Sequence, residues 1–438
     1  MEFTANPGGV LTGQLRVPGD KSISHRSIML GALAEGDTHI SGFLEGEDAL
    51  ATLKAFRAMG VVIDGPENGD VVVHGVGLHG LRAPDGDLYV GNSGTSMRLL
   101  AGLLAGQPFS VTMTGDVSLS KRPMARVADP LRLMGVGVDS AEGGRPPLTI
   151  NGNGGVKSID YTLPMASAQV KSCVLLAGLY AEGVTTVTEP APTRDHTERM
   201  LRGFGYSVTT DGARVSIIGG GKLKACTIEV PADISSAAFF MVAASIAPGS
   251  DITLTHVGIN PTRVGVINIL RAMGGDLTLL NQREVGGEPV ADIRVRGSAL
   301  VGIDIPEDQV PLAIDEFPVL FIAAACAQGR TVLKGAEELR VKESDRIQVM
   351  ADGLNALGVN AQATPDGIVI EGKGGSGAVF DGGRLNSHHD HRIAMSFAVA
   401  ALRATAPIVI EDCDNVATSF PHFVELARSA GMALESQA

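Results

Sequence analysis

This sequence has few of the residues that define several common classes of protein. It contains no tryptophan, and aromatic residues make up only 4% of it, so it offers few rings on which nucleic-acid bases could stack. Its formal net charge is -13, whereas proteins that bind DNA or RNA neutralise phosphates with an excess of Lys and Arg. We therefore expect no general nucleic-acid binding.

Cysteines and long apolar runs are also scarce. The four cysteines, Cys173, Cys226, Cys326 and Cys413, lie far apart, which favours buried thiols over a disulfide framework or a zinc site. No apolar run approaches the ~18 residues that span a bilayer. The first residues have neither the basic nor the apolar region of a signal peptide. These absences predict a soluble, cytoplasmic protein.

Glycine, by contrast, is abundant, at 56 of 438 residues, and it marks the turns of a pattern that recurs six times. Each copy has a polar start, a helix of small apolar residues, a glycine turn and a strand rich in Thr and Val. A second, more polar helix follows, ends at a glycine and leads into another strand. The copies start near Lys21, Asn92, Ser167, Asp233, Asp315 and Asp390.

These repeats predict the fold class. The chain is too long for one ordinary core, and its length favours two or three domains. Six units divide naturally into two domains of three. We expect an α/β protein built from repeated strand–helix–strand–helix units, with the helices inside and the sheets outside.

Cations stand at unusual places in this pattern. The stretch DKSISHRSIMLGAL, from Asp20, opens the first apolar helix with Lys21, His25 and Arg26. A helix start has unpaired N–H groups and about half a positive charge, so added cations repel it unless an anion binds. Cations recur at or near later helix starts, at Arg98, Arg122, Arg126, Arg194, Arg263, Lys342, Arg346 and Arg392.

The placement of these cations suggests an anionic ligand. Ser22 and Arg26 are four residues apart, as are Lys342 and Arg346, and each pair should share one helical face. If the helix starts face one cleft, their dipoles and cations converge there, and the ligand should carry several negative charges. The alternative is that surface helices simply carry Arg and Lys.

Eight motifs together resemble the 5-enolpyruvylshikimate-3-phosphate synthase family: DKSISHR, GNSGTSMR, SKRPM, MASAQVKS, IDEFP, ELRVKESDR, HDHRIAMS and ATSFP. They span nearly the whole chain. The resemblance implies transfer of the carboxyvinyl group of phosphoenolpyruvate to the 5-hydroxyl of shikimate 3-phosphate, with release of phosphate. This reaction belongs to the shikimate pathway, which leads to chorismate and the aromatic amino acids. No metal and no organic cofactor are implied, and a monomer is expected.

The resemblance also implies a domain arrangement. Residues 1–20 plus 231–438 would form one discontinuous domain with three repeat units, and residues 21–230 an inserted domain with the other three. Both would be inside-out α/β barrels, with the active site in the cleft between them.

Substrate-binding residues are carried over from the matching motifs. For shikimate 3-phosphate they are Lys21, Ser22, Arg26, Ser167, Ala168, Gln169, Arg194, Asp315 and Lys342. For phosphoenolpyruvate they are Lys21, Gly94, Arg122, Gln169, Arg346 and Arg392. Guanidinium groups suit both ligands because they bind carboxylates and phosphates through paired hydrogen bonds. Many relatives have a second serine where Ala168 stands, so only the backbone N–H can donate there.

The implied reaction needs two proton transfers. The hydroxyl loses a proton as it attacks C2 of phosphoenolpyruvate, and C3 gains one. Asp315 matches the base of the family, although its pattern alone would also suit a helix cap like those expected at Asp233 and Asp390. Glu343 and Lys21 are candidates for the C3 proton donor, and Glu343 could instead be a first-turn helix charge. The sequence leaves the donor open.

Gly94 bears on inhibition by glyphosate, which resembles phosphoenolpyruvate but is longer. Naturally insensitive relatives that share the MASAQVKS and RVKESDR motifs have alanine at this position. Because this sequence keeps Gly94, we predict a glyphosate-sensitive enzyme, with inhibition competitive against phosphoenolpyruvate.

Three other interpretations stay open at this point. His388, His389, Asp390 and His391 could bind a metal, although adjacent helical residues point different ways. UDP-N-acetylglucosamine enolpyruvyl transferases share the implied fold, but their relatives usually carry a cysteine in the loop that matches GDVSLSKRPMARV. A ring-forming DNA clamp is also built from six α/β units, but it needs cations along helix faces rather than at helix starts.

Overall fold

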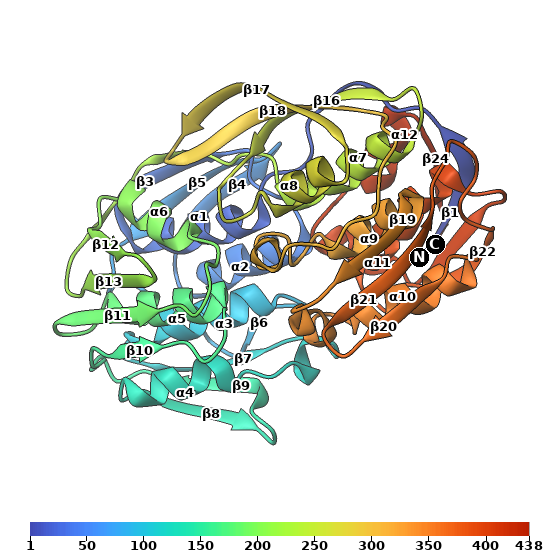
Figure 1. Cartoon of the computed structure of the whole chain (residues 1–438). Helices are drawn as coiled ribbons and strands as arrows, with labels where there is room; N and C mark the ends of the chain where they lie inside the picture. Colours follow the sequence, from blue (N-terminus) through green and yellow to red (C-terminus); the bar gives the residue numbers. More distant parts are fainter. Residues whose placement is uncertain (438) are drawn as a thin grey trace. The chain divides into compact units, whose positions relative to one another are not determined.

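The computed structural model describes residues 1–437, which divide into two compact units. The inserted unit comprises Gly19–Val230 with Val285–Gly287. The discontinuous unit comprises Met1–Pro18, Pro231–Glu284 and the chain from Glu288 onward. Figure 1 colours the inserted unit mainly blue to green and the discontinuous unit mainly yellow to red.

The inserted unit contains three repeats. Its α-helices are α1 (Lys21–Leu33), α2 (Glu47–Ala58), α3 (Gly94–Ala105), α4 (Ala125–Leu133), α5 (Ala168–Gly178) and α6 (His196–Gly203). One sheet has the order β14 (Leu223–Lys224), β3 (Ala34–Ser41), β5 (Asp70–Val76), β4 (Val62–Glu67), and β15 (Thr227–Glu229) also pairs with β3. The second is β6 (Leu88–Tyr89), β7 (Ser110–Thr114), β9 (Arg145–Asn151), β8 (Gly137–Ala141). The third is β10 (Asp160–Thr162), β11 (Val184–Thr188), β13 (Arg214–Ile218), β12 (Val208–Asp211).

The discontinuous unit contains the other three repeats. Its α-helices are α7 (Ile234–Ile246), α8 (Gly265–Ala272), α9 (Phe317–Cys326), α10 (Arg346–Ala356), α11 (His391–Ala400) and α12 (Phe423–Ala430). One sheet has the order β17 (Asp276–Val285), β18 (Glu288–Arg296), β16 (Asp251–Gly258), β2 (Thr12–Leu15). The second is β19 (Gln328–Leu333), β21 (Gly367–Lys373), β20 (Ala361–Thr364). The third is β22 (Gly383–Asn386), β23 (Ile408–Glu411), β1 (Glu2–Gly9), β24 (Met432–Gln437).

The six sheets share one plan, which confirms the repeat seen in the sequence. In five of them, the strand that follows the apolar helix pairs parallel with an edge strand and antiparallel with the next strand. In the β19 sheet, isolated parallel bridges at Val301 and Asp304 take the place of the edge strand. Among residues 1–437, none of the sheets closes on itself. The α/β class is confirmed at this level.

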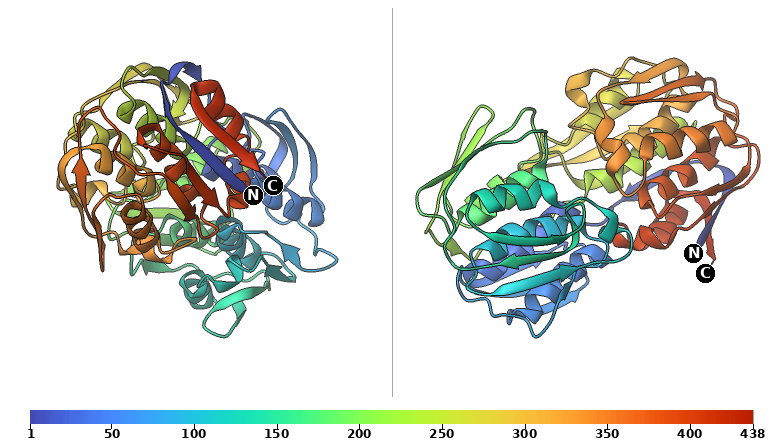
Figure 2. Two further views of the ribbon diagram at one scale, coloured as in Figure 1. Left: turned by 90° about the vertical axis from the view of Figure 1, so that its right-hand side faces the viewer. Right: turned by 90° about the horizontal axis from the view of Figure 1, so that it is seen from below.

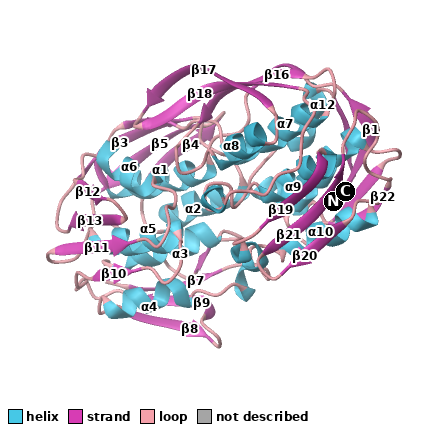
Figure 3. Cartoon of the chain, in the orientation of Figure 1, coloured by secondary structure: helices cyan, strands magenta, loops and turns pink. Residues whose placement is uncertain are grey.

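The apolar helices are the buried ones, because they are apolar on every side. Every residue of α7 and α9 is buried, and in α3 only Thr95 and Arg98 are not. The helices of each unit therefore lie against its sheets, as Figure 3 and the two views of Figure 2 show. Each apolar helix begins within two residues of its predicted start, so the side chains expected at the helix starts do lie there.

Two further observations concern the whole described chain. None of the helices within residues 1–437 is long and apolar enough to cross a membrane. The four cysteines are free thiols, and three of them, Cys173, Cys326 and Cys413, are buried.

Candidate active site

The start of α1 places two of the predicted anion ligands. Asp20 caps the helix by accepting a hydrogen bond from the Ile23 N–H at 2.9 Å. The Lys21 ammonium pairs with Asp48 at the start of α2, a partner that the sequence did not reveal. Ser22 and Arg26 share one face as predicted, because Arg26 Nη1 donates to the Ser22 carbonyl at 2.9 Å.

Arg26 is nearly buried and is held from two neighbouring helices. Its Nε donates to Thr197 Oγ1 of α6 at 2.7 Å, and its Nη2 donates to Ser172 Oγ of α5 at 2.9 Å. These hydroxyls fix the direction of the guanidinium and carry no charge themselves. Arg26 therefore has a defined position next to the first turn of α1.

His25 was expected among the cations of this helix start, and the structure corrects that expectation. Its side chain is fully buried, and Nδ1 lies 2.7 Å from Thr52 Oγ1 of α2. Burial lowers the pKa of His25 well below its usual value, and the charges of Lys21 and Arg26 lower it further. The imidazole is thus neutral and belongs to the interior.

The start of α3 brings three predicted phosphoenolpyruvate ligands together. Arg122 Nη2 donates to Asn92 Oδ1 at 2.6 Å, and Gln169 Nε2 donates to Thr95 Oγ1 at 2.9 Å. Gly94 lies between Asn92 and Thr95 as the first residue of the helix. No sequence signal marked Asn92 and Thr95 as orienting residues, but both lie in the GNSGTSMR motif and orient the predicted ligands.

Gly94 faces two guanidinium groups. A Cβ at this position would lie 3.0 Å from Arg98 Nη1 and 3.3 Å from Arg122 Nη1. Arg98 is itself oriented by Gln169, whose Oε1 accepts from Arg98 Nη1 at 2.6 Å. Glycine therefore leaves the space in front of two cations open at a helix start, where N–H groups also point outward.

The start of α5 holds the segment predicted to bind phosphate. Ser167 caps the helix, accepting from the Val170 N–H at 3.3 Å, and Ala168 and Gln169 form its first turn. Arg194 lies just before α6, is half-buried and has polar partners. The structure thus places each of these residues at a helix end, in agreement with the sequence pattern.

The sequence did not reveal a buried ion triad formed by Lys171, Glu189 and Glu198. Lys171 of α5 is 1% exposed and pairs with Glu189 at 3.0 Å and Glu198 at 2.7 Å. Thr193, next to Arg194, donates to Glu189. Burial raises the pKa of Glu189, and the nearby Glu198 carboxylate contributes, although Lys171 opposes the shift. The lysine in the otherwise apolar stretch VKSCVLLAG was the available signal.

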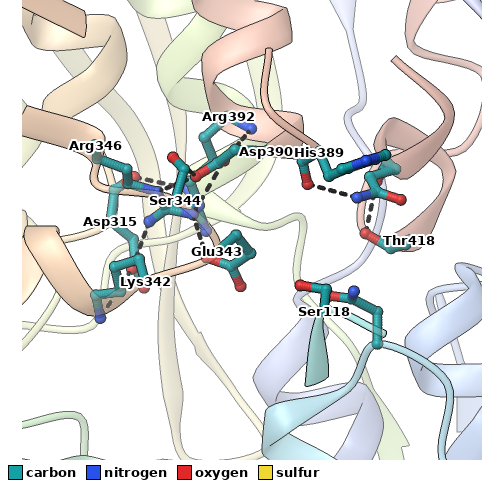
Figure 4. A network of polar contacts seen from close by, with 12 residues as sticks. Ser118, Asp315, Lys342, Glu343, Ser344, Arg346, His389, Asp390, Arg392 and Thr418 are labelled. Atoms are coloured by element: carbon teal, nitrogen blue, oxygen red, sulfur yellow. Dashed lines mark hydrogen bonds and ion pairs between the residues drawn. The ribbon is translucent and has the colours of Figure 1, made fainter. Parts of the chain in front are cut away.

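In the discontinuous unit, Arg346 is the centre of a cluster of charges (Figure 4). It is 1% exposed, and its Nε donates to Asp390 Oδ2 at 2.8 Å. Its Nη2 lies 2.7 Å from Glu343 Oε2, and its Nη1 lies 3.4 Å from Asp315 Oδ1. Burial disfavours the charged guanidinium, but the attraction of Asp390 and Glu343 outweighs burial and raises the pKa of Arg346.

Asp315 is not the helix cap that its pattern allowed. Helix α9 begins at Phe317, with Glu316 at the cap position. The Asp315 carboxylate instead lies 3.5 Å from Lys342 Nζ as well as beside Arg346. Two cations next to a partly exposed carboxylate favour its ionised form, which can accept a proton.

The arrangement of the ELRVKESDR segment differs in two respects from the helical pattern expected. Lys342 follows a 3-10 helix, Glu337–Val341, whereas α10 begins at Arg346 and is capped by Asp345. Lys342 and Arg346 therefore do not share a helical face, and that prediction was wrong. Glu343 precedes the helix, so it is not a first-turn charge either. The reason is the cap: the Asp345 side chain accepts from the Gln348 N–H and starts the helix there.

Arg392 completes the predicted set in this unit. Its Nη1 donates to the Asp315 carbonyl at 2.9 Å and lies 3.7 Å from Glu316. Asp390 caps α11 through the Arg392 N–H at 3.0 Å, as predicted, and Asp233 caps α7 in the same way.

The histidine-rich segment is organised differently from a metal site. His388 and His389 precede α11 in the left-handed backbone region, with φ of 54° and 57°. His389 Nδ1 lies 2.7 Å from Asp412, and the Asp390 carboxylate is occupied by Arg346. Within residues 1–437, no group of three or more His, Cys, Asp or Glu side chains is placed to hold a metal ion.

Comparison with known proteins identifies the relatives of this chain. Residues 5–426 match the model of the family described as EPSP synthase (3-phosphoshikimate 1-carboxyvinyltransferase). The chain is 69% identical over 434 residues to the 3-phosphoshikimate 1-carboxyvinyltransferase of Alkalilimnicola ehrlichii, covering 99% of this chain and 96% of that protein. It is 68% identical over 433 residues to that of Methylococcus capsulatus, covering 99% and 98%.

Solved structures agree with these relatives. An EPSP synthase from Acinetobacter baumannii matches with a TM-score of 0.90 and 64% identity, covering all of both chains. The enolpyruvyl transferase NikO from Streptomyces tendae matches with a TM-score of 0.79 at 16% identity, covering 99% of this chain and 98% of that one, and this match shows the fold alone. The family match favours neither the nucleotide-sugar transferase nor the DNA clamp.

Proposed function

Because the chain belongs to the EPSP synthase (3-phosphoshikimate 1-carboxyvinyltransferase) family, we propose how its residues share the reaction of that family. The enzyme transfers the carboxyvinyl group of phosphoenolpyruvate to the 5-hydroxyl of shikimate 3-phosphate and releases phosphate. The observation that carries the residue assignment is the cluster of Arg346, Lys342 and Asp315, which combines anion-binding cations with one carboxylate able to accept a proton.

We propose that shikimate 3-phosphate is bound chiefly by helix starts of the inserted unit. Ser167, the Ala168 N–H, Gln169 and Arg194 hold its phosphate, because a helix start supplies N–H donors and a favourable dipole for an anion. Lys21, Ser22 and Arg26 contact the same substrate. The capped start of α5 and the fixed guanidinium of Arg26 support this assignment.

Phosphoenolpyruvate is assigned to a second set of residues. Gly94 leaves room at the start of α3, where Arg122 and Gln169 are held, and Lys21 serves both substrates. Arg346 and Arg392 supply further cations, and Lys342 serves shikimate 3-phosphate. Several guanidinium groups suit a small trianion because each can donate two parallel hydrogen bonds to a carboxylate or phosphate.

The proposed proton transfers follow from the charges around Asp315. Its ionised carboxylate accepts the proton of the 5-hydroxyl as the hydroxyl oxygen attacks C2, and the C2–C3 electron pair takes up a proton at C3. The tetrahedral intermediate then loses a C3 proton and expels phosphate. Glu343 and Lys21 are the two candidates for the group that protonates C3, and Glu343 lies 2.7 Å from Arg346.

A measurement of substrate dependence tests this function. Phosphate release from phosphoenolpyruvate is measured with shikimate 3-phosphate, with UDP-N-acetylglucosamine, and with neither. We expect release with shikimate 3-phosphate only. Release with the nucleotide sugar, or equal release without any acceptor, would contradict the proposal.

Expectations about domain structure, location, oligomeric state and inhibition belong to the same proposal. The two units correspond to inside-out α/β domains with bounds near residues 20 and 230. The complete burial of α7 and α9 in the discontinuous unit and the nearly complete burial of α3 in the inserted unit support this. The enzyme acts in the cytoplasm as a monomer, without a metal or organic cofactor. Glyphosate competes with phosphoenolpyruvate.

A further inference from the structure

A chain of buried polar side chains crosses the interior of the inserted unit from α1 to α3. Its members, called here the α1–α3 relay, are His25, Thr52, Ser96 and Ser93. His25 Nδ1 lies 2.7 Å from Thr52 Oγ1, and Thr52 Oγ1 lies 2.7 Å from Ser96 Oγ. Ser96 Oγ lies 2.7 Å from Ser93 Oγ. All four side chains are at most 1% exposed.

The hydrogen bonds of the relay run in one direction. Ser96 donates its hydroxyl proton to Ser93, so its oxygen must accept from Thr52. Thr52 has then used its own proton and must accept from His25 Nδ1. The neutral imidazole with the proton on Nδ1 meets this requirement, and among the described residues the buried Nε2 has no hydrogen-bond partner.

The last member of the relay is the N-cap of α3. Ser93 Oγ accepts both the Ser96 hydroxyl and the Ser96 N–H, the latter at 3.0 Å. A cap fixes where a helix starts, and here hydrogen bonds link that cap to side chains of α1 and α2.

The start of α3 in turn orients the residues assigned to phosphoenolpyruvate. Asn92 holds Arg122, and Thr95 holds Gln169, so both ligands depend on residues adjacent to the Ser93 cap and to Gly94. Arg26, assigned to shikimate 3-phosphate, is held separately by Ser172 and by Thr197 on other helices. Gln169 is assigned to both substrates, but Gly94 and Arg122 are assigned to phosphoenolpyruvate alone, so a displacement of the α3 start affects the phosphoenolpyruvate ligands more.

We propose that the α1–α3 relay positions the start of α3 for phosphoenolpyruvate binding, with Thr52 as the residue that joins its two halves. The inference rests on the substrate assignment made under the proposed function. Thr52 acts through other residues, because its hydrogen-bond partners His25 and Ser96 are not among the proposed ligands. The lowered pKa of the buried His25 imidazole agrees with a neutral donor at the beginning of the relay.

The variant Thr52→Val tests the relay because it keeps the shape of the side chain and removes the hydroxyl. We expect the KM for phosphoenolpyruvate to rise between about three- and thirtyfold, with a much smaller change in the KM for shikimate 3-phosphate. Thr52→Ser keeps the hydroxyl and should restore values near those of the wild type. Equal rises for both substrates, or no rescue by serine, would overturn the proposal.

A matched control comes from the same unit. Thr38 on β3 is fully buried like Thr52, but its Oγ1 has no hydrogen-bond partner within residues 1–437. Thr38→Val should leave both KM values unchanged. An effect as large as that of Thr52→Val would show that loss of any buried hydroxyl disturbs the enzyme, and the relay would have no specific role.

Hydrogen exchange gives a second measurement that needs no substrate. In Thr52→Val the amides of residues 92–97 should exchange faster than in the wild type, whereas Thr52→Ser and Thr38→Val should not differ from it. Unchanged exchange in this segment would refute the positioning role. If Thr52→Val does not fold, Ser96→Ala removes the next link and is expected to give the same selective effects.

The substrate assignment is tested separately in the same assays by Arg122→Ala. A KM for phosphoenolpyruvate near the wild-type value in Arg122→Ala would count against the proposed ligands. The hydrogen-exchange result with Thr52→Val decides separately whether the relay positions α3.

Discussion

Three arginines of the inserted unit and two of the discontinuous unit are held by different kinds of hydrogen-bond acceptor. In the inserted unit, neutral oxygens orient Arg26, Arg98 and Arg122: two hydroxyls, the Gln169 amide and the Asn92 amide. In the discontinuous unit, carboxylates bind Arg263 and Arg346, at 3.0 Å from Asp233 and 2.8 Å from Asp390. A neutral acceptor orients a guanidinium group without placing a negative charge beside it. A carboxylate orients the group and also offsets its positive charge.

The kind of acceptor affects how strongly the stability of the protein depends on the partner of each arginine. Arg263 and Arg346 are at most 3% exposed, and a buried charge without a partner is costly, so removal of their carboxylates should destabilise the fold. The inserted unit has carboxylate pairs too, at Lys21 with Asp48, at Lys171 with Glu189 and at more exposed arginines such as Arg199 with Asp195. The comparison therefore concerns only the five arginines named above, and it predicts different consequences when their partners are removed.

The largest effect is expected for Asp315→Ala, which removes the carboxylate of the Arg346 cluster that is assigned as the base. Turnover should fall by about 10²–10⁴, because a general base contributes that much. Binding of shikimate 3-phosphate should be largely kept, since its phosphate contacts are elsewhere. Steady-state kinetics and titration calorimetry measure the two quantities. Turnover near the wild-type value would show that Asp315 is not the base.

Asp390→Ala tests whether the carboxylates of the discontinuous unit are structural. It leaves the buried Arg346 without its closest partner, so the free energy of unfolding should fall by about 3–5 kcal/mol. Urea denaturation measures the change. The matched control is Asp276→Ala, which breaks an exposed pair with Arg296 in the same unit and should cost at most about 1 kcal/mol. Equal losses in the two variants would break the comparison.

Arg122→Ala tests the inserted unit, where the arginine charge is assigned to a ligand. Its loss should weaken phosphoenolpyruvate binding by about 2–5 kcal/mol, because a desolvated anion is left underpaired. Asn92→Ala, which removes only the orienting amide, should have the same selectivity and a smaller effect. Kinetics at varied concentrations of each substrate measure both variants. An equal loss of affinity for the two substrates would place Arg122 elsewhere.

Gly94→Ala sharpens the description of the α3 start. The added methyl would meet Arg98 Nη1 at 3.0 Å and Arg122 Nη1 at 3.3 Å, which are ends of flexible side chains that can shift. We expect the wild type to be inhibited by glyphosate in competition with phosphoenolpyruvate. Gly94→Ala should raise the inhibitory concentration of glyphosate far more than it raises the KM for phosphoenolpyruvate. Inhibition of both proteins at several phosphoenolpyruvate concentrations is the measurement, and a wild type that is already insensitive would contradict the role of Gly94.

The smallest effect is expected at Glu189. Burial raises its pKa, so the folded state holds its proton more tightly than the unfolded state does. Stability from this group is complete below the unfolded pKa and is lost as pH rises through the folded pKa. Glu189→Gln should therefore flatten the dependence of unfolding free energy on pH above about pH 4.5. Denaturation at several pH values measures this, with the exposed Glu182→Gln as control. Identical slopes in wild type and Glu189→Gln would contradict the shift.

Much of this architecture could be predicted because the repeat is local. Apolar helices that are buried on all sides, glycine turns and Thr/Val strands each have short sequence signals, so the starts of the six apolar helices, α1, α3, α5, α7, α9 and α11, were placed within two residues. The site was partly predictable for the same reason, since the cations stand at those starts. What each cation binds depends on distant residues: Thr197 lies 171 positions from Arg26, and Asp390 lies 44 from Arg346.

The errors have similar physical causes. His25 has the sequence position of a surface cation, but its side chain turns toward Thr52 on another helix, a contact that sequence spacing does not reveal. Lys342 and Arg346 were placed on one helix because they are four residues apart. The Asp345 cap starts α10 after Lys342, and a cap is harder to predict than the helix that it begins.

The strand β1 has a consequence for the order in which the chain acquires its structure. Residues Glu2–Gly9 pair with Ile408–Glu411 on one side and with Met432–Gln437 on the other. During synthesis this strand remains unpaired until almost all of the remaining chain, which contains its partner strands, has been made. The strands of the inserted unit all lie between Ala34 and Glu229, so its sheets can assemble while the ribosome is still translating. The discontinuous unit, in contrast, can complete its last sheet only after translation has reached the final strand.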